Sequence, residues 1–236
     1  MRFARAVARY WDLRQLQASR QVARGNSDRG VRGAVTGGAQ LGPIAEFFRE
    51  MLGEFGLPSA WVLPNSALEL PGHFRPEKRW DLVVCREKHL IAAIELKSQV
   101  GPSFGNNFNN RAEEAMGSAT DLWAAYRESR LGSASPPFLG YFFLLEDCAQ
   151  VHKPVRSAAP TFPVDPEFVG ASYARRYELL CRRLMHQRLY SAACLTLTSS
   201  ASPEVPSHPS AELGIRPFLA SLAGHVRTHL EANNSG

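Results

Sequence analysis

The sequence predicts a mixed α/β fold in which helices flank one central β-sheet. Two observations predict it. Short apolar runs typical of strands alternate with longer runs whose apolar residues recur at helical spacing. The 236 residues, 44% of them hydrophobic and 21% charged, suffice for one sizeable core and have the composition of an ordinary globular chain. The expected order is a helix, three strands, a helix, a strand, a helix, a last strand and a final helix, preceded by an arginine-rich arm.

The arm opens the chain. Residues 2–22 place apolar side chains on one side of a predicted amphipathic helix. Residues 24–42 hold six glycines and show no periodic face, so we expect a long loop there. Residues 1–42 together carry eight arginines and two aspartates, and the planar guanidinium of arginine suits phosphates and guanine edges. Nucleic acid is therefore the partner to test, with Arg29 and Arg32 as candidate contacts, although a G+C-rich genome also favours arginine.

The predicted core begins at Pro43, a residue well suited to the first position of a helix, and this helix continues to Gly56. Three strands follow, and the short stretch between the last two reads as a turn. The strands are residues 60–64, 80–85 and 90–97.

The second half of the core continues the alternation. A helix is expected from about Arg111 to Arg130. Asn110 is a good N-cap for it, and Glu113 stands where a capping-box partner belongs. Residues 137–146 are apolar on both faces, as in a strand buried on each side. The remaining elements are a basic helix, a strand and a final helix, at residues 172–190, 191–199 and 210–231.

Composition excludes several classes of protein. No run approaches the roughly 18 uninterrupted apolar residues of a membrane-spanning helix. The arginine-rich start has no apolar block of the kind found in secretory signals. The four cysteines form no CxxC pair, which argues against a zinc ribbon and a disulfide scaffold. We therefore expect a protein of a reducing cytoplasm.

Three residues between positions 81 and 97 point to a chemistry. Glu95 and Lys97 are two apart on a predicted strand, so their side chains share one face. If this strand pairs with the preceding one, Asp81 comes alongside Glu95. Adjacent carboxylates repel each other unless a cation lies between them, and hard oxygen ligands suit Mg²⁺. Lys97 would then orient or deprotonate the attacking water. The alternative is a chance pattern of acids that face solvent.

These residues and the order of elements resemble the PD-(D/E)xK nuclease superfamily, whose core is a helix, three strands, a helix and a further strand. Trp80 replaces the proline that usually precedes the aspartate. In the superfamily an acid on the helix before the first strand often completes the metal site. The resemblance therefore implies a restriction-endonuclease-like core and makes Glu46 the best third ligand, with Glu50 second.

A longer motif makes the resemblance more specific. Residues 95–121, ELKSQVGPSFGNNFNNRAEEAMGSATD, and residues 79–84, RWDLVV, resemble the XhoI-type Type II restriction endonucleases. This implies a Mg²⁺-dependent homodimer of the bacterial cytoplasm that cuts both strands of CTCGAG and leaves 5′-phosphate ends with a 5′ overhang. It also implies a cognate DNA methyltransferase that protects the host site.

The resemblance covers most of the chain, so we expect a single endonuclease domain over residues 1–236. Within it, residues 1–42 would be the DNA-contacting arm, residues 43–200 the catalytic core, and residues 201–236 a linker and the C-terminal helix.

The long motif also holds side chains suited to reading DNA. A carboxamide both donates and accepts, as an adenine edge requires, and an arginine suits a guanine edge or a phosphate. The candidates are Asn106, Asn107, Asn109 and Arg111. Gln99 continues the face of Glu95 and could touch the metal-bound water or the phosphate, and Ser103 lies in the turn expected beside it. Glycine and asparagine are also common turn residues, so a structural role is the alternative.

Two other functions stay open. A repair or recombination nuclease of the same superfamily would act on DNA structure rather than on a sequence. A non-catalytic DNA-binding module of the same fold would bind duplex with a steep salt dependence and show no turnover.

Overall fold

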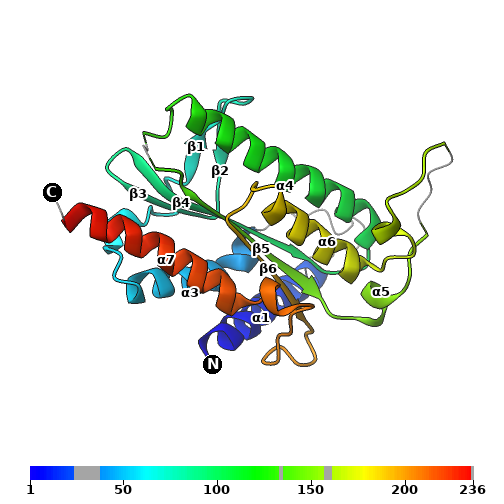
Figure 1. The fold of residues 1–236 in the computed structure, drawn as a ribbon. Helices are drawn as coiled ribbons and strands as arrows, with labels where there is room; N and C mark the ends of the chain where they lie inside the picture. Colours follow the sequence, from blue (N-terminus) through cyan, green and yellow to red (C-terminus); the bar gives the residue numbers. More distant parts are fainter. Residues whose placement is uncertain (24–37, 133–134, 157–160, 235–236) are drawn as a thin grey trace.

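A four-stranded mixed sheet lies at the centre of the protein, with helices on both of its faces, as Figure 1 shows. The computed structural model describes residues 1–23, 38–132, 135–156 and 161–234. The strands lie in the order β3-β4-β5-β6; β3 and β4 are antiparallel, whereas β4, β5 and β6 run parallel. Their bounds are β3 (Leu82–Arg86), β4 (His89–Gln99), β5 (Phe138–Glu146) and β6 (Ala192–Thr198). The mixed α/β prediction is confirmed.

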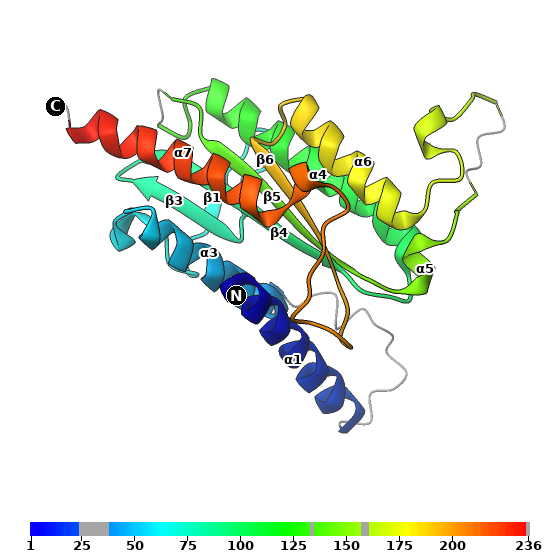
Figure 2. The same cartoon turned by 60° about the horizontal axis from the view of Figure 1, so that its bottom comes forward.

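The helices form a layer on each face of the sheet (Figure 2). On one face lie α4 (Phe104–Arg127) and α6 (Tyr173–His186). These two helices connect β4 to β5 and β5 to β6, because parallel neighbours need a crossover of this kind. On the other face lie α1 (Arg2–Ala23), α3 (Gly42–Glu54) and α7 (Ile215–Asn234). The shorter elements are α5 (Ala149–His152), η1 (Gly38–Leu41), η2 (Ser59–Trp61), η3 (Pro166–Phe168) and η4 (Ala211–Leu213).

The sheet separates two apolar cores. In β4, Ile94 and Leu96 belong to the core beneath α1, α3 and α7, whereas Ala93 belongs to the core beneath α4 and α6. This alternation follows from the two-residue period of a strand. β5 is buried at every position from Phe138 to Leu145, which explains its continuous apolar sequence.

The prediction of a strand at residues 60–64 is wrong. Ser59–Trp61 forms a 3-10 turn, and Val62 makes only a single bridge to Val84. The structure instead contains a separate two-stranded antiparallel sheet, β1 (Glu69–Pro71) and β2 (Glu77–Arg79). Each of these strands has three residues, and β2 is entirely charged, so neither carries an apolar pattern that could reveal it.

The predicted start of the helix at Arg111 is also wrong, because α4 begins at Phe104 with Ser103 in the N-cap position. Asn110 is therefore an exposed residue inside the helix and not its cap. Phe104 and Phe108 lie four residues apart, and both enter the core between α4 and the sheet. Their burial stabilises a first helical turn whose asparagines have low helix propensity.

Asp121 of α4 holds the loop between β1 and β2. Its Oδ1 accepts hydrogen bonds of 2.7 Å from the backbone N–H groups of His73 and Phe74, and its Oδ2 accepts one of 2.7 Å from Nε of Arg75. Burial alone would raise the pKa of Asp121, but the Phe74 N–H and the Arg75 guanidinium outweigh burial and lower it. The Asp121 carboxylate thus binds α4 to the β1–β2 hairpin, and we call this set of three hydrogen bonds the Asp121 clamp.

Replacing this clamp should destabilise the fold. We expect Asp121→Asn to lower the free energy of unfolding by about 1–3 kcal/mol, because charge-assisted hydrogen bonds are lost, as measured by urea denaturation at pH 7. Glu113→Gln, at an exposed position of the same helix, is the control and should change little.

The same pair of proteins gives a pH signature. The pKa of Asp121 is lower in the folded state than in the unfolded state. Its contribution to the free energy of unfolding is therefore complete above the unfolded-state pKa and is lost as the pH falls through the folded-state pKa. The difference between wild type and Asp121→Asn should narrow below about pH 4. If the difference in free energy of unfolding stayed constant with pH, the charge of Asp121 would contribute nothing to stability.

Candidate active site

The β3–β4 hairpin brings Asp81 and Glu95 together. The register pairs Leu82 with Ile94, so the preceding residue, Asp81, lies opposite Glu95. The Asp81 N–H donates to the Ile94 carbonyl at 3.3 Å, and the Leu96 N–H donates to Oδ2 of Asp81 at 2.8 Å. The pairing expected from the sequence is confirmed, and the Asp81 carboxylate is anchored on the backbone of β4.

Two lysines enclose the carboxylate of Glu95, which is only 2% exposed. Lys97 forms an ion pair with Oε1, as its position two residues along β4 allows. Lys78 of β2 forms a second ion pair, with 2.5 Å between its Nζ and Oε2 of Glu95. The Lys78 ammonium also lies 4.3 Å from the centre of the Trp80 ring, a cation–π contact. Both oxygens of Glu95 are thus bound to cations.

The charges of the cluster follow from these contacts. Burial, and then the neighbouring Glu95 carboxylate, raise the pKa of Asp81. Burial would also raise the pKa of Glu95, but the ammoniums of Lys97 and Lys78 outweigh burial and lower it. Burial lowers the pKa of Lys97, yet the attraction of Glu95 is stronger and the net shift is upward. At neutral pH Glu95 is therefore a carboxylate and Lys97 an ammonium. Lys97 can donate hydrogen bonds, but it cannot take a proton from water.

Asp81 and Glu95 fit a divalent cation. They are two hard oxygen donors side by side, and a cation between them would relieve their repulsion, which adds to the effect of burial in raising the pKa of Asp81. Within the described ranges, no group of three or more His, Cys, Asp or Glu side chains is gathered closely enough to hold a metal ion. A cation here would complete its shell with water and phosphate oxygens.

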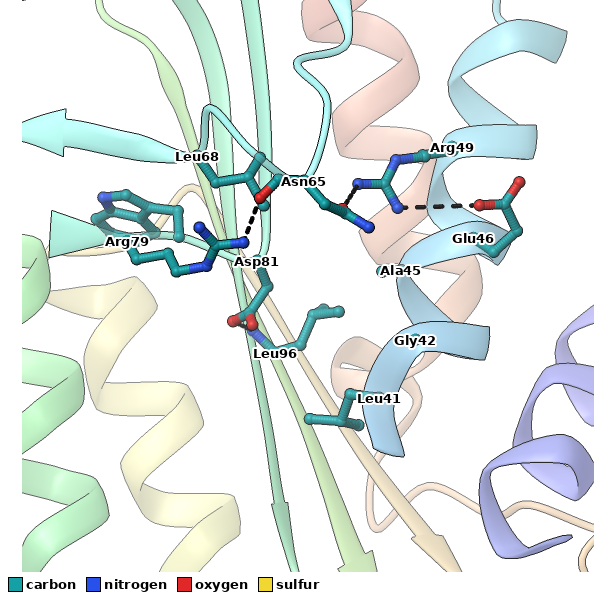
Figure 3. Close-up of a pocket in the computed structure, with 11 residues that line it drawn as sticks. Leu41, Gly42, Ala45, Glu46, Arg49, Asn65, Leu68, Arg79, Asp81 and Leu96 are labelled. Carbon is teal, nitrogen blue, oxygen red and sulfur yellow. Dashed lines mark hydrogen bonds and ion pairs between the residues drawn. The ribbon is translucent and has the colours of Figure 1, made fainter. Parts of the chain in front are cut away.

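Glu46 lies across a cavity from Asp81. The cavity has a volume of about 390 Å³ between α3 and the hairpin, and both acids line it. Figure 3 shows the Glu46 carboxylate pointing away from Asp81 and toward Arg49, with 3.9 Å between Nη1 of Arg49 and the carboxylate. Glu50 lines a different hollow, between α1 and α3. The structure therefore does not bring either residue into the Asp81–Glu95 pair.

The cavity beside Asp81 has a basic rim. Arg49 donates to the side chain of Asn65 at 2.6 Å, and Arg79 donates to the Asn65 backbone carbonyl (Figure 3). Two guanidiniums thus flank an opening that reaches Asp81, and each of them also has an acid beside it, Glu69 at 2.6 Å from Arg79 and Glu46 at 3.9 Å from Arg49.

The other predicted contacts lie around the start of α4. Gln99 is 4% exposed, and its amide donates to the carbonyls of Val100 at 3.1 Å and Ser103 at 3.5 Å, so it shapes the turn between β4 and α4. The amide of Asn107 donates to the same Ser103 carbonyl at 2.6 Å. Asn109 is exposed on the helix. The side chain of Asn106 lies outside the described part of the chain, as do Arg29 and Arg32.

Arg111 lies near the cluster formed by Asp81, Glu95 and Lys97. Its Nη1 pairs with Glu114 at 2.5 Å, and its positive charge is one of the influences that lower the pKa of Lys97. Its Nε is buried and, in the described structure, has no hydrogen-bond partner. This side chain is therefore a cation held beside Lys97.

Comparison with known proteins identifies the family. The family model described as restriction endonuclease XhoI matches residues 20–207, a range that contains Asp81, Glu95 and Lys97. The chain belongs to the XhoI restriction endonuclease family. Members of this family are site-specific deoxyribonucleases, and so is this protein. The resemblance found in the motif at residues 95–121 is thereby confirmed.

Curated relatives agree with membership of the XhoI family. The Type II restriction enzyme BstVI of Geobacillus stearothermophilus is 47% identical over 208 residues, which cover 85% of this chain and 93% of the relative. The Type II restriction enzyme XhoI of Xanthomonas vasicola is 49% identical over 183 residues, 76% of this chain and 72% of the relative. The enzyme AbrI of Azospirillum brasilense is 40% identical over 158 residues, 66% of this chain and 71% of the relative. No solved structure matches the chain.

As a restriction endonuclease of this family, the protein acts on duplex DNA. None of the helices in the described residues has both the length and the apolar character needed to cross a membrane.

Lys78 could not be recognised from the sequence. It stands three residues before Asp81, in a strand too short and too charged to be recognised. The sequence shows only that a lysine stands shortly before Trp80 and Asp81. This position indicates a site residue only once β2 is known to lie beside β4.

Removing the charge of Asp81 should stabilise the metal-free protein. Its raised pKa means that the ionised form is less favourable in the folded state than in the unfolded state. We expect Asp81→Asn to raise the free energy of unfolding by about 0.5–2 kcal/mol at pH 7, because the amide oxygen can still accept from Leu96. The gain should vanish below about pH 4, where the acid is protonated in both states.

Urea denaturation in a chelator measures this gain, and Asp12→Asn, an exposed change on α1, is the control. Adding Ca²⁺ should then stabilise the wild type and leave Asp81→Asn unaffected. If Asp81→Asn were less stable than the wild type in chelator, the conclusion that the ionised Asp81 destabilises the folded state would be wrong.

Proposed function

We propose that this restriction endonuclease uses Mg²⁺ to cut both strands of the palindrome CTCGAG, leaving 5′-phosphate ends and a 5′ overhang. The observation that carries the proposal is the hairpin contact of Asp81 with Glu95, with the Lys97 ammonium on the same face. The named relatives support the restriction function, and the motif at residues 95–121 supports the XhoI-type site.

The chain's own side chains account for most of the proposed mechanism. Asp81 and Glu95 would hold the metal, which would supply charge neutralisation at the phosphate and make a water more acidic. Lys97 is protonated because of Glu95, and its ammonium donates a hydrogen bond to the attacking water or to a phosphate oxygen. This contact keeps the water in line with the phosphorus. The new bond joins the water oxygen to phosphorus, and this water gives up a proton to solvent. The bond from phosphorus to the 3′ oxygen breaks, and that oxygen takes a proton from solvent and leaves as a hydroxyl. The phosphate therefore stays on the 5′ end.

Glu46 is retained as a proposed outer ligand because it lines the same cavity as Asp81. Its side chain is 61% exposed, and its 3.9 Å contact with Arg49 is an exposed pair of low energy. A change of rotamer, rather than a movement of α3, would turn its carboxylate toward the cavity.

The first turns of α4 are proposed as the DNA-reading surface. The positive end of the helix dipole and the donors of its asparagines favour an approaching phosphate or base edge. The exposed Asn109 suits a base edge, whereas Arg111, beside Lys97, suits a phosphate near the cut bond. Ser103, Asn106 and Asn107 are further candidates in the same turns, and Gln99 contributes by shaping the turn.

The proposed partners follow from the palindrome. A two-fold homodimer presents the same surface to each half-site, so we expect a dimer on duplex DNA. Arg29 and Arg32 of the arm are proposed to contact the DNA backbone. In the bacterial cytoplasm, a methyltransferase of the same specificity would protect the host site.

Loss of the metal ligand or of the lysine should stop cleavage. We expect Glu95→Gln and Lys97→Ala to cut plasmid with Mg²⁺ at least about 10³-fold more slowly than wild type, because charge stabilisation at the phosphate is lost. Glutamine keeps one oxygen acceptor for a neighbouring lysine, and thermal melting checks that the variant is folded. Duplex binding in Ca²⁺, measured by gel shift, should persist.

Lys88→Ala, in the exposed turn between β3 and β4, removes a lysine outside the site and should cut normally. If Glu95→Gln or Lys97→Ala cuts at the wild-type rate, the site assignment is refuted. If the wild type binds duplex but shows no Mg²⁺-dependent turnover, the non-catalytic alternative is correct.

The recognition site is tested by sequencing the ends from a digest of mixed-sequence DNA. We expect every cut to fall within CTCGAG and to leave a 5′ overhang. Discrete cuts at another sequence would overturn the proposed site and leave the restriction function intact. Cuts at flaps, ends or single strands instead would favour the repair nuclease.

A further inference from the structure

Lys78 is an active-site cation that the catalytic strand does not provide. It stands on β2, in the small two-stranded sheet, and reaches Glu95 of β4 in the central sheet. Its side chain is 13% exposed and lies against the Trp80 ring. A surface lysine keeps its ammonium in water, whereas this one is withdrawn from solvent and directed at a buried carboxylate.

The two lysines on Glu95 are not equivalent. Lys97 is on the same strand as Glu95, and its ion pair follows from the two-residue spacing. Lys78 occupies the other oxygen, Oε2, from a different element of the fold. A metal held by Asp81 and Glu95 needs one of those two oxygens. A metal that takes Oε2 would displace Lys78, whereas one that takes Oε1 would displace Lys97.

We infer that Lys78 holds Glu95 while the metal site is empty and, once the metal takes its place, turns its ammonium to a phosphate oxygen of the bound DNA. This inference rests on the proposed function. A largely buried ammonium that loses its carboxylate needs another anion, because an unpaired buried charge is costly. The phosphate at the metal is the anion that DNA binding brings there, and the Trp80 face limits how far the lysine can move.

The inference predicts opposite effects on metal binding and on cleavage. In Lys78→Gln the amide can still donate to Glu95, so the fold is preserved, but a positive charge that competes with the metal is gone. Calcium titrated calorimetrically into DNA-free protein should bind about tenfold more tightly to Lys78→Gln than to wild type. Lys88→Gln is the control for loss of a lysine charge and should bind as the wild type does.

Cleavage should change in the other direction. With saturating Mg²⁺ and the DNA that the wild type cuts, the single-turnover rate of Lys78→Gln should fall by about 10²-fold, since a charge near the phosphate is missing. Lys78→Arg restores a cation and should recover most of that rate. Thermal melting confirms that both variants are folded.

The outcomes separate the two proposals. Calcium affinity of Lys78→Gln within twofold of wild type, or cleavage by Lys78→Gln at the wild-type rate, would overturn the role of Lys78 while the proposed function stands. Failure of Lys78→Arg to recover activity would also overturn it, because the role requires only a cation there. A wild type that neither binds Ca²⁺ nor cuts would overturn the proposed function, and the role of Lys78 with it.

Discussion

The arrangement of the site depends on the burial of the Glu95 carboxylate. A charge that is only 2% exposed needs partners of opposite sign, and the structure supplies two lysines. One comes from β4 itself and the other from β2, in the small sheet, and its neighbours Leu70 and Trp80 pack into the same core as the central sheet. The same burial places Asp81 beside an anion, so the cluster has a carboxylate pair ready for a divalent ion. The fold thus maintains a repulsion that a bound cation would relieve.

The central sheet could be predicted because its residues repeat with the period of a strand. Glu95 and Lys97 share a face for that reason, and the uninterrupted apolar sequence of β5 marks a strand buried on both sides. Family membership could be read from one long motif. The short strands β1 and β2 could not be predicted, since three residues are too few to show a period and those of β2 are all charged. Lys78 was missed with them, because its role arises from packing between two sheets.

The start of α4 shows how a local misassignment alters a functional interpretation. Asparagines favour turns, and the sequence accordingly suggested a loop before a helix at Arg111. The buried pair Phe104 and Phe108 outweighs that tendency, so the asparagines lie on a helix. Asn107 and Arg111 are then four residues apart on one face, and Asn109 points elsewhere. The helix therefore offers different faces to the catalytic cluster and to solvent.

The clamp made by Asp121 links two parts of the protein that are far apart in sequence. It ties the loop of the β1–β2 hairpin to the middle of α4, whose first turns are the proposed reading surface. β2, which carries Lys78, is consequently fixed to the same rigid rod as Asn109 and Arg111. Lys78 and the proposed DNA-contacting side chains are therefore parts of one packed unit, so a substitution that loosens the hold of Asp121 would disturb both together.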